Sequence, residues 1–496
     1  MRRSGILMPI SALPSNYGIG SFSKEAYEFV DFLEKSEQSL WQILPLGPTG
    51  YGDSPYQSFS TFAGNPYFID LDDLVKRGWL TEAECKKTFT GKVTDDIDYE
   101  HIYKTRFILL KKAYEKSAIG KDPEFKKFVK ENGFWLNDYA LYMAVKNSFS
   151  GVSWIHWDEG IRLRRKAQMD EYKKKYASDI EFYQFLQYMF FTQWMALKKY
   201  ANERGISIVG DIPIYVAFDS SDTWSNPKLF ELDKNNLPVR VAGCPPDAFS
   251  ATGQLWGNPL YKWDVHKKEG YKWWIRRFAH CYKLYDVIRI DHFRGFDEYY
   301  AIPYGDETAE FGSWQPGPGY DIFKAMKDEL GQKEVIAEDL GYLTDSVIKL
   351  VKKTGYPGMK VLLFAFDSRE PSDYLPHMYS SNTVVYTGTH DNDTVEGWIR
   401  SARRADVSFA MKYLGVKKRK DIREALLRAA LGCVSDTCII PMQDYLGLDN
   451  EARINVPSTL GGNWVWRMSP DALSDELSAH IRELTVLYGR SLKTRR

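Results

Sequence analysis

Short apolar runs recur along this chain, and eight of them are followed by polar or glycine-rich turns. Most of the eight are apolar at nearly every position, which is typical of strands buried on both faces of a parallel sheet. Helical patterns separate several of them, for example at 320–330 and 344–354. The runs lie at 5–9, 40–46, 207–213, 286–291, 334–339, 360–366, 382–391 and 437–444.

Eight strand-like runs with helical connections predict a (β/α)₈ barrel of the α/β class. The length of 496 residues suits one elaborated barrel over 1–496, because barrels of this type exceed about 400 residues when they carry insertions. A doubly wound open sheet is the main alternative fold. The sequence has no GxGxxG after an early strand and no P-loop, so nucleotide binding has no support.

Two long segments interrupt the regular spacing of the runs. We predict that 51–204, between the second and third strands, is a mainly helical insertion, and that 218–280 is a second insertion between the third and fourth. Such insertions are expected at the C-terminal face of the strands, where they shape a cleft. The second contains a loop at 243–261 with Pro245, Pro246 and Trp256. We interpret this loop as a flexible cover over the cleft; an ordinary surface loop is the alternative.

Charge and composition exclude several classes of function. The 66 basic and 66 acidic residues cancel, whereas a nucleic-acid-binding surface requires a basic excess or stripe. No stretch of 18 apolar residues is present, so we expect no membrane partner and no transmembrane helix. The apolar run after Arg3 is too short for a signal peptide, and Pro9 interrupts it. Five scattered cysteines without a CxxC pair indicate reduced thiols and a cytoplasmic location.

Charged side chains gather at the predicted C-terminal ends of the strands, where the chemistry of such barrels is located. A carboxylate that ends an apolar strand is costly unless it is solvated, paired or used. The residues at these positions are Asp211, Arg289, Asp291, Glu338, Asp339, His390, Asp391, Asp393 and Asp444.

Arg289 and Asp291 are two residues apart on one predicted strand, so their side chains project to the same face. The neighbouring guanidinium is expected to lower the pKa of Asp291, which suits a nucleophile; a structural ion pair is the alternative. Apolar neighbours are expected to raise the pKa of Glu338, which suits a general acid. A Glu338 that caps the next helix is the alternative reading.

The segment 388–394 places His390 and Asp391 after another strand. No second histidine lies at ligand spacing, so we predict no metal and favour hydrogen bonding to sugar hydroxyls. Two carboxyls about 5–5.5 Å apart carry out retaining glycosidic chemistry, and a third carboxylate stabilises the developing positive charge.

At these motifs the chain resembles the amylomaltase family of the α-amylase clan, whose members are also called disproportionating enzymes or 4-alpha-glucanotransferases. The resemblance runs from Gly5 to beyond the last predicted strand. The motifs that carry it are SPYQS at 54–58, GDIPIYV at 210–216, GQLWGNPLY at 253–261, RIDHFRG at 289–295, AEDLG at 337–341 and GTHDNDT at 388–394.

The resemblance implies that Asp291 is the nucleophile, Glu338 the general acid/base and Asp391 the transition-state stabiliser. It implies α-1,4-glucans and maltooligosaccharides as donor and acceptor, and no required cofactor. The residues that it places against substrate are Arg289, His390, Asp211, Tyr56, Ser54, Asp247, Gln254, Trp256, Asn463 and Tyr99, the last with the weakest support.

Two other functions stay open at this stage. An α-amylase-type hydrolase would share the same strand-end chemistry, and only the SPYQS and GQLWGNP segments favour transfer over hydrolysis. A catalytically silent glucan-binding protein would be expected to lack one of the three carboxylates, and all three are present.

Overall fold

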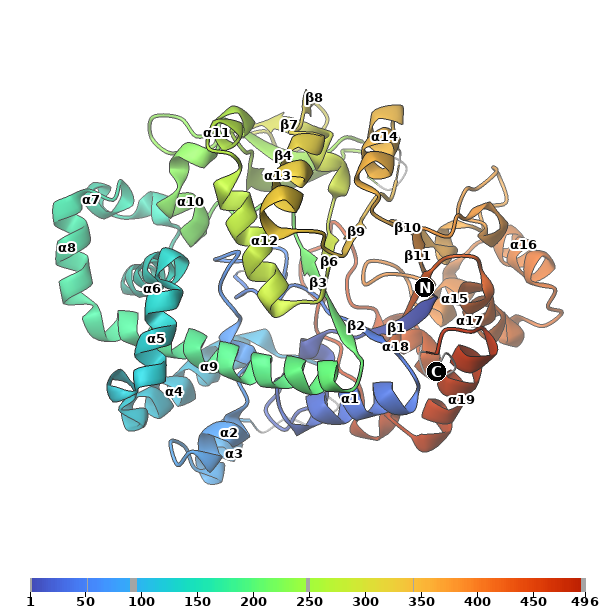
Figure 1. Cartoon of the computed structure of the whole chain (residues 1–496), viewed down its shortest axis with the longest axis horizontal. Coiled ribbons are helices and arrows are strands. Elements are labelled where there is room, and N and C mark those ends of the chain that lie inside the picture. The colour runs from blue at the N-terminus through green and yellow to red at the C-terminus, as the bar shows by residue number, and fades with distance from the viewer. Residues whose placement is uncertain (1, 51, 90–95, 247–249, 342, 492–496) are drawn as a thin grey trace.

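The centre of the molecule is a closed barrel of eight parallel strands, in the order β1-β12-β11-β10-β9-β6-β3-β2. The computed structural model describes residues 2–50, 52–89, 96–246, 250–341 and 343–491. The closed parallel barrel confirms the predicted fold class and excludes the open sheet (Figure 1). The barrel strands are β1 Arg3–Leu7, β2 Leu40–Gln42, β3 Ser207–Ile212, β6 Val287–Ile290, β9 Val335–Ala337, β10 Gly358–Val361, β11 Thr383–Tyr386 and β12 Thr437–Pro441.

Each of the eight apolar runs overlaps one barrel strand, but the sixth run begins and ends later in the sequence than its strand. The prediction of a strand at 360–366 is wrong in its bounds, because β10 ends at Val361 and a 3-10 turn follows at Leu362–Phe364. Leu362 and Leu363 are buried in the turn as they would be in a strand. Apolar residues report burial and not backbone hydrogen bonding, so the pattern did not separate the two conformations.

Pairing between the first and last strands closes the barrel. β1 pairs in parallel with β12 on one side, from Arg3↔Thr437 to Leu7↔Pro441, and with β2 on the other. Arg490 reinforces this junction, because its guanidinium donates to the carbonyl of Arg3 at 3.0 Å and to that of Asp436 at 3.3 Å. The two ends of the chain therefore lie on the same side of the barrel (Figure 1).

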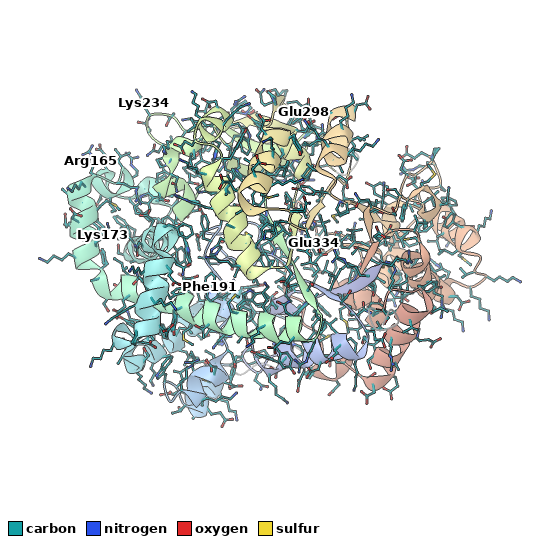
Figure 2. The ribbon with its side chains drawn as sticks, in the orientation of Figure 1. Arg165, Lys173, Phe191, Lys234, Glu298 and Glu334 are labelled. Atoms are coloured by element: carbon teal, nitrogen blue, oxygen red, sulfur yellow. The ribbon has the colours of Figure 1, made fainter. Side chains whose placement is uncertain are left out.

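The described part of the segment between β2 and β3 is mainly helical. Its long helix α9 packs along α6 and against α1, and Gln187 of α9 both accepts from and donates to the backbone of Gly64. Arg165 and Lys173 stand at the outer end of this region (Figure 2). The helices up to β3 are α1 Lys24–Lys35, α2 Leu71–Lys76, α3 Glu82–Thr88, α4 Tyr99–Ser117, α5 Pro123–Glu131, α6 Gly133–Ser148, α7 Glu159–Arg162, α8 Lys166–Lys175 and α9 Ala177–Glu203.

The second insertion is not purely helical. It contributes β4 Arg240–Cys244 and β5 Gln254–Pro259 to an antiparallel sheet of order β5-β4-β7-β8, completed by β7 Glu298–Pro303 and β8 Ser313–Pro316 from beyond β6. The sequence analysis did not anticipate these strands, which are short and carry prolines and glycines. The helices of the insertion are α10 Ser221–Ser225, α11 Trp263–Lys268 and α12 Lys272–Leu284.

The remaining helices lie between and after the later barrel strands, from β9 onward and just before it. The predicted helices at 320–330 and 344–354 are confirmed as α13 Tyr320–Leu330 and α14 Asp345–Thr354. The others are α15 Val395–Ser401, α16 Arg404–Leu414, α17 Ile422–Gly432, α18 Met442–Leu446 and α19 Asp475–Leu487. In the described parts of the chain, no helix combines the length and apolar character needed to cross a membrane.

Candidate active site

A buried ion pair joins the ends of two neighbouring barrel strands. Strand register places Asp211 of β3 directly beside Arg289 of β6. Arg289 Nη1 lies 2.6 Å from Asp211 Oδ2 and 3.1 Å from Asp291 Oδ1. Because Arg289 and Asp211 are each only 3% exposed, their charges depend on one another for compensation. The guanidinium of Arg289 therefore lies beside Asp291, as predicted.

Asp291 and Glu338 occupy equivalent positions just beyond two adjacent strands. Ile290 of β6 is in register with Ala337 of β9, and each carboxylate is the next residue. The pairing continues past the strands, since Glu338 N–H donates to the carbonyl of Ile290 at 3.1 Å. Neighbouring strands lie about 4.8 Å apart, and residues at equivalent positions project to the same face. The two residues therefore start one strand spacing apart, which allows the carboxyl separation of about 5–5.5 Å used in retaining glycosidic chemistry.

Burial raises the pKa of both carboxyls in this pair, and for Asp291 the direction differs from the prediction. Burial raises the pKa of Asp291 to about 7; Arg289 opposes the shift, while Asp211, Glu338 and Asp391 add to it. The prediction that Arg289 gives Asp291 a lowered pKa is therefore wrong in net direction. Burial also raises the pKa of Glu338, as predicted. The pair can thus hold one proton near neutral pH, and the contact with Arg289 favours the charge on Asp291.

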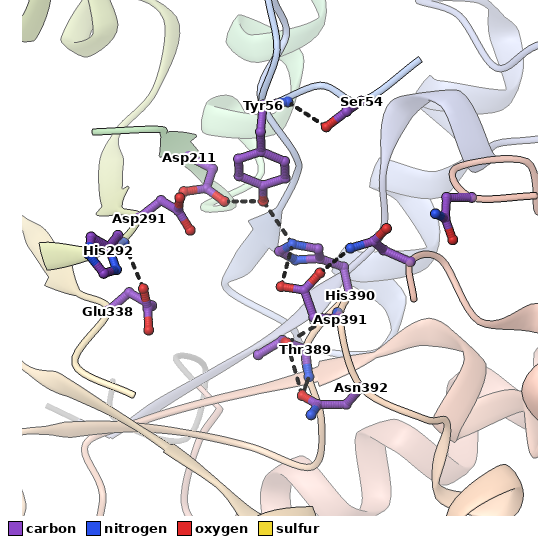
Figure 3. Close-up of polar contacts among 12 residues, drawn as sticks. Ser54, Tyr56, Asp211, Asp291, His292, Glu338, Thr389, His390, Asp391 and Asn392 are labelled. Carbon is purple, nitrogen blue, oxygen red and sulfur yellow. Dashed lines mark hydrogen bonds and ion pairs between the residues drawn. The ribbon is translucent and has the colours of Figure 1, made fainter. Parts of the chain in front are cut away.

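Backbone donors fix the orientation of Glu338. One carboxyl oxygen accepts from His292 N–H at 2.6 Å (Figure 3). The other accepts from Leu340 N–H at 3.1 Å. His292 has a φ of 49°, an uncommon left-handed conformation for a residue with a side chain. The ring of Trp256 contacts His292 edge to face at 4.9 Å. The sequence analysis missed His292, although it lies inside the RIDHFRG motif.

His390 and Asp391 face the carboxyl pair from the loop after β11 (Figure 3). His390 Nε2 lies 3.2 Å from Asp391 Oδ2 and 2.9 Å from the hydroxyl of Tyr56. The same hydroxyl donates to Asp211 at 2.7 Å, so Tyr56 links the two sides of the site. Burial alone would raise the pKa of Asp391, but His390 and Asn455 hold it at about 2. Asp391 is therefore ionised at every physiological pH.

Two residues that the sequence analysis missed hold the Asp391 loop from behind. Asn455 Nδ2 donates to Asp391 Oδ1 at 2.5 Å, and the Asn455 N–H donates to the carbonyl of His390 at 3.0 Å. Arg453 donates to the carbonyl of Asp391 at 2.6 Å and pairs with Asp393. No sequence pattern marks these residues, because they follow the last barrel strand and lie more than 60 positions from their partners.

The other predicted substrate residues lie around this cluster. Ser54 Oγ accepts from Tyr56 N–H at 3.3 Å, and Gln254 Oε1 accepts from the indole of Trp256 at 3.1 Å. Both residues are partly exposed. Of the predicted contacts, Asp247 falls outside the described residues.

Tyr99 and Asn463 are further from the carboxylates. The Tyr99 hydroxyl donates to the carbonyl of Trp464 at 2.9 Å, and the indole of Trp464 packs 5.9 Å from the rings of both Tyr56 and His390. Tyr99 therefore reaches the site through Trp464, another residue that the sequence analysis missed. Asn463 Oδ1 accepts from Val456 N–H at 2.9 Å and so shapes its own loop.

The described residues contain no group of three or more His, Cys, Asp or Glu side chains that could hold a metal ion. The arrangement offers the chemistry of paired carboxyls, a third ionised carboxylate and a buried cation. Fold and site together define a (β/α)₈ enzyme that acts on glycosidic bonds.

Comparison with known proteins identifies the family. The family model described as 4-alpha-glucanotransferase matches residues 8–474. A 4-alpha-glucanotransferase of Streptococcus pneumoniae is 50% identical over 492 residues, which cover 99% of this chain and 97% of the relative. One from Clostridium butyricum is 48% identical over 97% of this chain and 100% of its own length.

A solved structure agrees with these relatives. The amylomaltase from Streptococcus agalactiae in complex with acarbose superposes with a TM-score of 0.95 at 41% identity, covering 99% of this chain and 100% of that one. The chain belongs to the 4-alpha-glucanotransferase (amylomaltase) family. Its enzymatic activity is that of a 4-alpha-glucanotransferase, and membership in this family implies glucan substrates.

Proposed function

We propose that this enzyme moves segments of α-1,4-glucan to glucose or oligosaccharide acceptors by a retaining double displacement, with Asp291 as the nucleophile and Glu338 as the general acid/base. The observation that carries the proposal is the placement of these two carboxyls one residue beyond adjacent, registered strands. Donor and acceptor are both maltooligosaccharides or longer α-1,4-glucans. The buried thiols of Cys85, Cys281 and Cys438, none of them in a disulfide, support the cytoplasmic location that we also propose.

In the first step, Asp291 attacks the anomeric carbon while Glu338 protonates the departing glycosidic oxygen. The shared proton of the pair begins on Glu338, because Arg289 stabilises the charge on Asp291. The shortened glucan leaves, and a glycosyl ester on Asp291 remains.

In the second step, Glu338 removes a proton from the acceptor hydroxyl, which attacks the anomeric carbon and releases Asp291. Asp391 is ionised throughout and faces the carboxyl pair, so it stabilises the positive charge that develops on the sugar in both steps. Tyr56, His390 and Arg289 form a connected polar wall beside it, which suits contacts to sugar hydroxyls.

The part of the cleft near Trp256 supports transfer over hydrolysis. Trp256 lies on β5 and packs against His292, whose N–H holds Glu338. An aromatic surface beside the acid/base suits the apolar face of an acceptor sugar and displaces water from the glycosyl ester.

The experiment is incubation of maltotriose with the wild type and with Asp291→Asn. We expect the wild type to give a ladder of longer chains plus glucose, and Asp291→Asn to be inactive while its circular dichroism spectrum is unchanged. Asp345→Asn, which changes an exposed carboxylate on α14, is the matched control and is expected to behave as the wild type. Near-normal turnover by Asp291→Asn would overturn the assignment of the nucleophile, and shortening of the substrate without longer products would overturn transfer.

A further inference from the structure

Strand β5 departs from regular pairing at the point where it carries Trp256. The register of β4 and β5 shifts between Val241 and Gly243, so that three residues of β5 lie opposite one residue of β4. We call these three residues, 256–258, the bulge. Gly257 at its centre has a φ of 76°, a conformation that glycine adopts without strain. Bulges occur beside active sites, where they change the direction of a side chain.

Gln57 supplies hydrogen bonds to the bulge from outside the sheet. Its Nε2 donates to Oδ1 of Asn258 at 3.1 Å and, over a longer distance of 3.4 Å, to the carbonyl of Trp256. Asn258 Nδ2 in turn donates to Gln57 Oε1 at 3.4 Å and to the carbonyl of Val216, after β3, at 2.9 Å. Asn258 is only 5% exposed, so its amide depends on these partners.

Through these contacts Gln57 connects two sides of the candidate site. It directly follows Tyr56, whose hydroxyl donates to Asp211 at 2.7 Å (Figure 3). On the other side, the ring of Trp256 packs against His292, whose N–H donates to the general acid/base. The SPYQS and GQLWGNP segments, which favoured transfer over hydrolysis in the sequence, are therefore joined by one pair of side-chain amides.

We propose that Gln57 is a positioning residue that holds the bulge and thereby sets how the glycosyl ester is divided between a sugar acceptor and water. The inference rests on the roles proposed above for Asp291, Glu338 and Trp256. In both routes an oxygen attacks the anomeric carbon, the bond from that carbon to Asp291 breaks, and the proton of the attacking hydroxyl or water goes to Glu338.

The two routes differ in how much they depend on the bulge. An acceptor sugar must be held against the ring of Trp256, whereas water reaches the ester without such support. Loss of the Gln57 amide frees the bulge, so the ring no longer has a fixed place beside His292. Binding of the acceptor then weakens and the ester becomes more open to water. Hydrolysis therefore gains relative to transfer, whatever happens to total turnover.

The test compares Gln57→Met with Gln193→Met on maltotriose. Methionine is similar in length to glutamine and has no amide. Gln193 is a matched control, because its amide also makes three hydrogen bonds among the described residues, to Asp70 and Asp73 at the start of α2. Those bonds join α9 to α2 and contact none of the residues of the candidate site.

The readout is the ratio of hydrolysis to transfer. Transfer between two maltotriose molecules gives glucose and maltopentaose and leaves the number of reducing ends unchanged, whereas hydrolysis adds a reducing end for each bond that is cut. The gain in reducing ends therefore counts hydrolysis, and the glucose released beyond that gain counts transfer. The ratio does not depend on the fraction of enzyme that is folded, so it separates positioning from a general loss of stability.

We expect Gln57→Met to raise this ratio about fivefold to tenfold, the change that the loss of about one net hydrogen bond produces. Gln193→Met should keep the wild-type ratio. Equal ratios for the two variants would refute the role of Gln57. Adding Gln57→Met to Trp256→Ala should change the ratio no further, and a full additional increase would show that Gln57 does not act through Trp256.

Gly257→Ala perturbs the same bulge without replacing Gln57. A Cβ at this position meets no atom within 4 Å, so the substitution acts through the φ of 76° alone. The ratio should rise in this variant as well, and an unchanged ratio would mean that the bulge does not control the division of the ester. Failure of the proposed function would be recognised separately, by a wild type that forms no product longer than maltotriose.

Discussion

Replacing Asn455 with alanine tests whether the support behind Asp391 matters for catalysis. The substitution removes the hydrogen bond of 2.5 Å from Asn455 Nδ2 to Asp391 Oδ1. A hydrogen bond to a charged group contributes about 1.5–3 kcal/mol, and about 1.4 kcal/mol corresponds to a tenfold change in rate. The side chain of Asp391 is 41% exposed, so water replaces part of the lost bond. We therefore expect kcat to fall about 10-fold to 30-fold, the lower part of that range.

The pH profile gives a second readout of the same change. Asn455 is one of the groups that hold the pKa of Asp391 at about 2, so its loss raises that pKa. Asp291, whose pKa of about 7 is much higher, sets the acid limb of the profile, so this limb should stay in place while kcat falls. At neutral pH, Asp391 stays ionised through His390, and the loss of kcat reports lost orientation.

The assay is the initial rate of glucose release from maltotriose, measured over a range of substrate concentrations. Asn202→Ala is the matched control, because Asn202 Nδ2 donates to the carboxylate of Asp286 at 2.8 Å near the start of β3 and β6, away from the site. A kcat for Asn455→Ala within about twofold of that for Asn202→Ala would refute the reasoning, since such a small change is worth less than a weak hydrogen bond.

Three further predictions follow from the same geometry. Glu338→Gln should lower kcat on maltotriose about 10²-fold to 10⁴-fold. The variant should still form the glycosyl ester from a glucosyl fluoride, because fluoride leaves without help from an acid. Equal loss of activity on both substrates would contradict the role of Glu338 as the acid. Arg289→Gln should raise the pKa of Asp291 above about 7, because Arg289 opposes the shift caused by burial. The acid limb of kcat/KM should therefore move to higher pH, and an unmoved limb would contradict the assignment of this limb to Asp291. Gly210→Ala should lower the free energy of unfolding by about 1–3 kcal/mol, because the new Cβ would lie 2.1 Å from the ring of Tyr285. An unchanged melting temperature would contradict this clash.

The barrel was predictable because burial on both faces leaves a strong trace in the sequence. Runs such as 207–213 and 437–444 are apolar at most positions, and each proved to contain a barrel strand. Polar residues at the strand ends then pointed to the site, since the topology of a parallel barrel brings all such ends to one face. The division into insertions at 51–204 and 218–280 stays a prediction about domain organisation.

Features that depend on tertiary contacts were not predictable in this way. Strands β5 and β8 expose part of their surface and have no continuous apolar run, so they carry little signal. The role of Asn455 could be recognised only from its contact with Asp391 in the folded structure, because an asparagine in a loop has no characteristic sequence pattern. The pKa of Asp291 required knowledge of how deeply the surrounding protein encloses it, and the neighbouring Arg289 alone indicated the wrong direction.

The pairing of β1 with β12 has a consequence for how the enzyme matures on the ribosome. β1 emerges during translation more than 400 residues before β12, one of its two neighbours in the barrel. Until then β1 has an unpaired edge, which is open to wrong partners. The enclosure that aligns Asp211, Asp291, Glu338 and Asp391 is complete only once β12 has been synthesised, so the active site cannot form before that point.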